Sequence, residues 1–155
     1  IQWHMIGHVQ SNKVKYMAPY VDLIHGVDSL KLLKEIDKQA TKNNRIIPCL
    51  LQIHIAQEDN KFGFSAQECQ QAIEMSKEFP HVHIKGLMGM ASYTEDQKQI
   101  AQEFAGLKNL YDQLIQQNHR LETLSMGMSG DYPLAIAQGS NMIRVGSKIF
   151  GPRNY

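Results

Sequence analysis

Apolar residues in this sequence gather in two kinds of segment that follow each other along the chain. The first kind is a short, nearly continuous apolar run, and the longest covers residues 46–55. Such a run is typical of a strand that is buried on both faces in a parallel sheet. Shorter runs predict further strands at 3–7, 21–25, 82–90, 121–125 and 141–145, the first of them as the end of a buried strand.

The second kind of segment carries apolar residues three and four positions apart, which is the spacing of one helix face. Ser65 and Glu68 have the spacing of a capping box at the start of one such segment. Because strands and helices alternate, the sequence predicts an α/β fold of parallel strands joined by right-handed crossovers. The predicted helices cover 10–17, from Asp28 or Ser29 to 40, 65–79, about 95–118 and 132–138.

Residues 125–155 contain two small glycine-bearing turns, each directly after a short apolar run. Ser129 and Ser147 stand where a helix is expected to begin after each turn. Glycine lets backbone N–H groups approach an anion, and the N-terminus of a helix favours negative charge. Two neighbouring turns of this kind predict a phosphate cradle.

The place of this cradle decides between two folds. The sequence has neither a Gly-x-Gly-x-x-Gly segment after its first strand nor a Walker motif, which disfavours a doubly wound nucleotide-binding sheet. In (β/α)8 barrels, by contrast, phosphate sits after strands seven and eight. We therefore expect a TIM barrel. This chain, which starts abruptly at Ile1, would hold about six of its eight units, three to eight, as a single N-terminally truncated domain over 1–155.

Composition narrows the classes of function. The net charge is +1 and the 16 Lys and Arg residues are scattered, which argues against a nucleic-acid partner. No apolar run approaches the roughly 20 residues of a membrane span. The 7 histidines show no metal-ligand spacing, so no metal site is expected. Cys49 and Cys69 lie in apolar patterns and are expected to be buried thiols of a cytoplasmic protein.

Five segments of the chain resemble one family in their order and spacing. They read Trp-His-Met-Ile-Gly-His-Val-Gln-Ser-Asn-Lys at 3–13, Asn-Lys-Phe-Gly at 60–63, Lys-Gly-Leu-Met-Gly-Met at 85–90, Leu-Ser-Met-Gly-Met-Ser at 124–129 and Ile-Arg-Val-Gly-Ser-Lys-Ile-Phe-Gly at 143–151. These segments resemble the small pyridoxal-phosphate homeostasis proteins, also called YggS-like proteins or proline synthetase co-transcribed homologues. That family shares the barrel of the alanine racemase N-terminal domain.

The resemblance implies a pyridoxal 5'-phosphate (PLP) site of fold type III, with the phosphate held by the two turns. An arginine on the last strand would face the pyridine nitrogen and, because it cannot give up its proton, would keep that nitrogen unprotonated. The family's Schiff-base lysine lies upstream of the Trp-His motif, so no catalytic residue is assigned here. His4 stands at a strand end, as part of the site or as a core histidine. The other implied cofactor-binding residues are Gly127, Met128, Ser129, Arg144, Gly146 and Ser147.

The leading functional hypothesis is a PLP-binding protein of intracellular PLP homeostasis, which stores and delivers the cofactor with little or no turnover. PLP-dependent apoenzymes would receive the cofactor, and the full-length protein would be a monomer. The alternative is a PLP-dependent amino-acid racemase of the same fold. Racemisation needs two positioned bases, and the sequence offers none in an obvious position. A barrel enzyme with a phosphorylated sugar or indole substrate ranks third, because the strand ends lack acidic or lysine catalysts.

Overall fold

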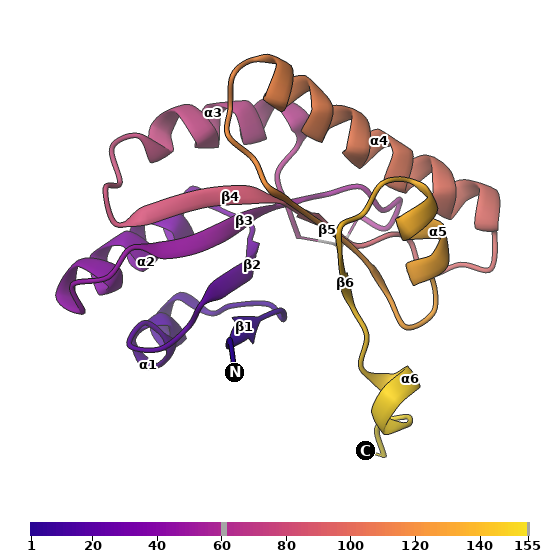
Figure 1. Ribbon diagram of the computed structural model, residues 1–155, viewed down its shortest axis with the longest axis horizontal. Helices are drawn as coiled ribbons and strands as arrows, with labels where there is room; N and C mark the ends of the chain where they lie inside the picture. The colour runs from indigo at the N-terminus through magenta and orange to yellow at the C-terminus, as the bar shows by residue number, and fades with distance from the viewer. Residues whose placement is uncertain (60–61, 155) are drawn as a thin grey trace.

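The computed structural model describes residues 1–59 and 62–154. In this part of the chain the strands form one six-stranded sheet, and every neighbouring pair is parallel. Each strand lies beside the one that precedes it in the sequence, and the sheet curls into half of a barrel (Figure 1). The predicted α/β class, with its parallel strands and partial barrel, is confirmed. The strands are β1 (His4–Met5), β2 (Leu23–Val27), β3 (Ile47–Ile53), β4 (Val82–Gly89), β5 (Thr123–Met128) and β6 (Met142–Arg144).

Helices connect the strands, and the longer ones cover the outer face of the sheet. Figure 1 shows α3 and α4 along the convex side of the curve. No helix in the described residues is long and apolar enough to cross a membrane. The helical segments are the 3-10 turn η1 (Ser11–Lys13), α1 (Val14–Met17), α2 (Leu30–Lys42), α3 (Ala66–Ser76), α4 (Gln97–Gln116), α5 (Tyr132–Ala137) and α6 (Ser147–Phe150).

Side-chain caps fix where the three long helices begin. The Ser29 hydroxyl accepts a hydrogen bond from the backbone of α2, and it is Ser29 rather than Asp28 that caps this helix. Ser65 and Glu68 form both bonds of the predicted capping box at α3. Asp96 caps α4. Each cap of this kind stabilises its helix by about 1 kcal/mol.

The main hydrophobic core lies between the sheet and its helices. Alternate strand residues such as Ile24, Leu51 and Leu124 point outward and pack with helix residues such as Ile36 and Phe104, all fully buried. Burying one such side chain contributes roughly 1.5–3 kcal/mol. The two cysteines are also buried, as predicted, and burial raises the pKa of the Cys69 thiol to about 12.

The inner face of the sheet is different, because its apolar layer is small. Leu23, Leu50 and Met88 form a separate buried cluster there. Nearer the carboxyl ends of the strands, buried inner-face residues are polar: His25, Gln52, Ser125 and Arg144. A ligand at that end of the half-barrel would therefore meet hydrogen-bonding groups.

Three expectations about local structure are wrong. Strand β5 does not end at Ser125 but continues to Met128, so Gly127 and Met128 lie within the strand. Helix α5 begins at Tyr132, as predicted, but Asp131 and not Ser129 occupies the position directly before it. The first strand is not buried, since His4 on β1 is exposed and Trp3, directly before this outermost strand of the described sheet, is 58% exposed.

Candidate functional site

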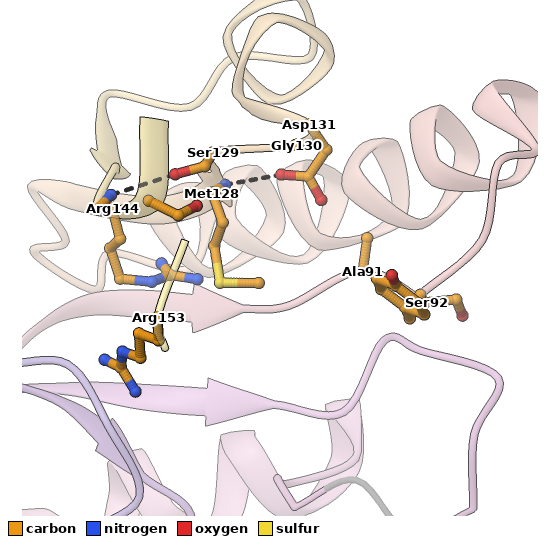
Figure 2. Close-up of a pocket in the computed structure, with 11 residues that line it drawn as sticks. Ala91, Ser92, Met128, Ser129, Gly130, Asp131, Arg144 and Arg153 are labelled. Carbon is orange, nitrogen blue, oxygen red and sulfur yellow. Dashed lines mark hydrogen bonds between the residues drawn. The ribbon is translucent and has the colours of Figure 1, made fainter. Parts of the chain in front are cut away.

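A cavity of about 420 Å³ lies at the carboxyl ends of β4, β5 and β6. Its position follows from the topology, since parallel strands end at the same edge of a sheet and their following loops meet there. In Figure 2, Ala91 and Ser92 lie on one side of the cavity, across from Met128, Ser129 and Arg144. The lining residues are Ala91, Ser92, Tyr93, Met128, Ser129, Gly130, Asp131, Arg144, Gly146, Ser147 and Arg153.

The turn after β5 is held tightly by its own residues. The backbone N–H of Met128 donates to Asp131 Oδ1 at 2.7 Å, and the backbone N–H of Asp131 donates back to the Met128 carbonyl at 3.1 Å. Gly127 has φ +101°, and a Cβ there would lie 2.6 Å from the Cβ of Ala135. Glycine is required at this position for both reasons. The turn therefore presents Ser129 to the cavity in a fixed place.

Ser129 joins the two predicted turns directly. Its hydroxyl oxygen accepts hydrogen bonds from the backbone N–H groups of Gly146 (3.2 Å) and Lys148 (3.3 Å), at the start of α6 (Figure 2 shows the first). The sequence placed Ser129 at the start of α5, whereas it instead caps the helix after the next strand. Both turns of the predicted cradle are thus brought to one place.

Arg144 comes from the inner face of β6 and is only 8% exposed. Its guanidinium donates to Ser125 Oγ at 2.5 Å and to the carbonyl oxygen of Gly89 at 3.2 Å. Burial lowers the pKa of Arg144 to about 10, and the nearby carboxylate of Asp131 partly offsets this. Arg144 therefore remains a cation at neutral pH, on the wall of the cavity.

The contact with Ser125 continues inward to two histidines. Ser125 Oγ lies 2.9 Å from His25 Nδ1, and His25 Nε2 lies 3.1 Å from His4 Nδ1. Burial lowers the pKa of His25 to about 3, and electrostatic repulsion from Arg144 and from the His4 ring lowers it further. His25 is therefore neutral under physiological conditions.

The structure brings most of the predicted site residues together. Five of them, Met128, Ser129, Arg144, Gly146 and Ser147, line the one cavity. Gly127 lies behind the wall, where it packs against α5. His4 does not line the cavity and reaches Arg144 only through His25 and Ser125.

Sequence reasoning missed several residues at this site. Asp131 and Arg153 line the cavity, and Ser125 and His25 contact its wall through Arg144. A signal for Arg153 was available, since it stands two residues after the last motif in a segment already assigned to phosphate. For His25 there was none, because it is separated from Ser125 by 100 positions.

Comparisons with known proteins agree with the resemblance. The model of the alanine racemase N-terminal domain matches residues 1–154. A curated pyridoxal phosphate homeostasis protein of Aquifex aeolicus is 38% identical over 100% of this chain and 68% of its own length. The chain belongs to the pyridoxal phosphate homeostasis protein family. A relative of the same name from Haemophilus influenzae is 35% identical over 100% of this chain and 66% of its own length. The chain thus spans about two thirds of these relatives.

Solved structures agree with this family assignment. PipY of Synechococcus elongatus PCC7942, solved without PLP, is 35% identical with a TM-score of 0.90 over 97% of this chain and 71% of its own. The same protein solved with PLP bound has a TM-score of 0.87, over the same shares of the two chains, at 33% identity. Alanine racemase of Clostridium difficile is 14% identical with a TM-score of 0.77, over 100% of this chain and 41% of its own, and so shares the fold.

Proposed function

We propose that this chain binds PLP in the cavity after β4, β5 and β6, and that it serves intracellular PLP homeostasis by holding and releasing the cofactor. Support comes from the name that its curated relatives carry and from PipY, which was solved with PLP bound. The proposed cofactor-binding residues are Met128, Ser129, Arg144, Gly146 and Ser147, with Arg153 added, whereas the predicted residues Gly127 and His4 lie outside the cavity lining. The observation that carries the proposal is the junction of the two turns through Ser129, beside the buried cation of Arg144.

The residues present fit the cofactor. A volume of about 420 Å³ is within the range of small-molecule sites. Arg153 supplies positive charge for a phosphate, and Ser129 and Ser147 line the same cavity. A Cβ added at Gly146 would meet no atom within 4 Å, so the backbone there faces open space that a phosphate oxygen could enter.

The chain's own groups also favour storage over turnover. When bound, PLP supplies an aldehyde that reacts with amines and a pyridine ring that withdraws electrons. Arg144 is a donor without acceptor capacity and keeps its proton, so a pyridine nitrogen opposite it stays unprotonated and the ring withdraws electrons less strongly. Of the described lining residues, none is a lysine or a histidine, and the carboxylate of Asp131 is engaged by the turn backbone.

The remaining expectations about the whole protein belong to this proposal. The six units correspond to units three to eight of one barrel domain. PLP-dependent apoenzymes are the proposed recipients of the cofactor, and the full-length protein is proposed to be a cytoplasmic monomer. The racemase alternative predicts exchange of the α-proton of alanine in heavy water. Exchange by the PLP-loaded protein, followed by proton NMR, would replace the storage role with a catalytic one.

Calorimetric titration of the 155-residue chain with PLP tests the binding site. We expect saturable binding of one PLP, and we expect Arg144→Gln to weaken it by about tenfold or more, since hydrogen bonds to charged groups are worth about 1.5–3 kcal/mol. Arg120→Gln is the matched control, because Arg120 is exposed and lies outside the cavity lining. Absence of saturable binding, or equal affinity in all three proteins, would contradict the proposed site.

A further inference from the structure

Four side chains on the inner face make a continuous line across the half-barrel. They come from β1, β2, β5 and β6, and they are His4, His25, Ser125 and Arg144. Strands β2 and β5 are not neighbours in the sheet, so the contact between His25 and Ser125 spans the concave face rather than following the sheet. His25 is 1% exposed and Ser125 is completely buried. Buried polar groups of this kind are nearly always hydrogen-bonded, and leaving a buried donor without a partner is costly.

The chemistry of the four groups gives this line a direction. Arginine only donates, so Ser125 Oγ must accept from Arg144. The hydroxyl hydrogen of Ser125 is then directed to His25 Nδ1, which makes Nδ1 the acceptor. The proton of a neutral His25 therefore sits on Nε2 and is donated to His4 Nδ1. The opposite direction would leave the Ser125 hydroxyl hydrogen buried without an acceptor.

We propose that Ser125 and His25 are positioning residues for Arg144, held with His4 in one directed hydrogen-bond chain that fixes both imidazoles as the Nε2–H tautomer. The neutral state of His25 agrees with this assignment, because a protonated ring would have no acceptor at Nδ1. Arg144 is then fixed from two sides, by Ser125 and by the Gly89 carbonyl. These are the two side-chain hydrogen bonds of Arg144 within the described residues, and the same side chain lines the cavity.

The consequence for the ligand rests on the proposed function. A guanidinium held in one orientation loses little conformational freedom when a ligand binds, so it binds more tightly than a mobile one. Removing the Ser125 hydroxyl should therefore weaken PLP binding although Ser125 does not line the cavity. His25 should act in the same way through Ser125. His4 is exposed and is the member of the hydrogen-bond chain farthest from Arg144, so replacing its side chain should have the smallest effect on PLP binding.

The tautomers can be read without any cofactor. Two-bond proton–nitrogen NMR spectra of the 15N-histidine-labelled 155-residue chain distinguish Nε2–H from Nδ1–H rings. We expect His25 and His4 in the Nε2–H form above pH 7. In Ser125→Ala, His25 loses its partner at Nδ1 and should no longer hold a single tautomer. Ser76→Ala is the matched control, because it removes a partly buried hydroxyl from α3, away from the cavity.

A second readout concerns Arg144 itself. We expect Ser125→Ala to raise the Kd for PLP about fivefold to tenfold, while Ser76→Ala leaves it unchanged. His25 in the Nδ1–H form in the unmodified chain would overturn the proposal, and this readout is independent of whether Ser125→Ala folds. Unchanged tautomers and unchanged affinity in a folded Ser125→Ala would also overturn it. If no variant and no parent binds PLP, the proposed function fails while the tautomer assignment still stands on its own spectrum.

Discussion

His25 and Arg144 are two buried ionisable side chains on the inner face of the half-barrel, and burial lowers the pKa of both. Their situations differ. Arg144 keeps its charge at neutral pH, and a pKa lowered from 12.5 to about 10 corresponds to a cost of roughly 3 kcal/mol to the folded state. That cost is fully present below about pH 10. Destabilisation of this kind is typical of binding sites, because an anion bound in the cavity would stabilise the buried cation of Arg144.

His25 leads to a prediction about stability and pH. Its pKa is about 3 in the folded chain and 6.5 in the unfolded chain, so the unfolded state binds the extra proton between these values. Stability therefore falls as the pH drops below about 6.5. Between pH 7 and pH 5 this single group should cost about 2 kcal/mol.

Urea unfolding at pH 7, 6 and 5 measures this effect. His25→Gln should be less stable than the parent at pH 7, because it breaks the contact with Ser125, but its stability should decline less steeply toward pH 5 by about 2 kcal/mol. His83→Gln is the control, because His83 is exposed, and its decline should follow that of the parent. Parallel declines in all three proteins would show that His25 titrates normally.

At the scale of elements, β4 contains an irregularity in its pairing with β3. The pairing of β3 with β4 shifts between Cys49 and Leu50, so that Lys85 is an extra residue on β4. Directly after it, a Cβ at Gly86 would lie 1.7 Å from the carbonyl oxygen of Thr123 on β5. Glycine in a strand often marks such a bulge or a close approach of two backbones. Here it marks both.

Gly86→Ala should therefore separate β4 from β5 and destabilise the fold. We expect a loss of about 3 kcal/mol or more, because the clash is with backbone atoms that cannot rotate away. Gly106→Ala is the matched control in α4, where an added Cβ meets no atom within 4 Å and glycine is a poor helix former. That variant should gain about 0.5–1 kcal/mol. Thermal and urea unfolding followed by circular dichroism decide the outcome, and a neutral Gly86→Ala would mean that the strands can adjust.

The elements that the sequence predicted well are those whose signals are local. Helix starts follow from caps such as Ser65 and Glu68, and strands follow from apolar runs such as 46–55. The end of β5 was missed because Met128 and Gly127 resemble a turn in sequence, whereas Met128 pairs with Arg144 on β6. The cavity residues on consecutive loops could be found from the two turns. The bond from Ser125 to His25 could not, because no local pattern records which strands face each other across a curved sheet.

At the scale of the whole molecule, the described sheet has two outer strands, β1 and β6, at the two ends of the curve (Figure 1). Apolar side chains are exposed at both ends. Trp3 is 58% exposed beside β1, and Ile143 on β6 is 37% exposed. In α6, directly after β6, Phe150 is 87% exposed. Unpaired strand edges with apolar neighbours readily pair with other chains.

The 155-residue polypeptide should therefore associate with itself in solution. Light scattering coupled to size-exclusion chromatography should show a mass that rises with protein concentration, and the near-neutral net charge of +1 does little to oppose this. Ile143→Lys should reduce the association, because a charged side chain on an edge strand opposes pairing. Ile115→Lys is the control: it replaces an exposed isoleucine on helix α4 rather than on an edge strand, and should leave the association unchanged.

The same experiment distinguishes pairing of strand edges from non-specific association through exposed apolar surface. If the open edges cause the association, a polypeptide that supplies the part of a full-length relative outside the matched two thirds should compete with it by pairing with the edges of this sheet. The mixture should then shift toward a one-to-one complex and the larger species should decline. A single monomeric mass at all concentrations would mean that the edges are protected by means other than pairing. An equal effect of Ile115→Lys and Ile143→Lys would instead assign the association to exposed apolar surface in general.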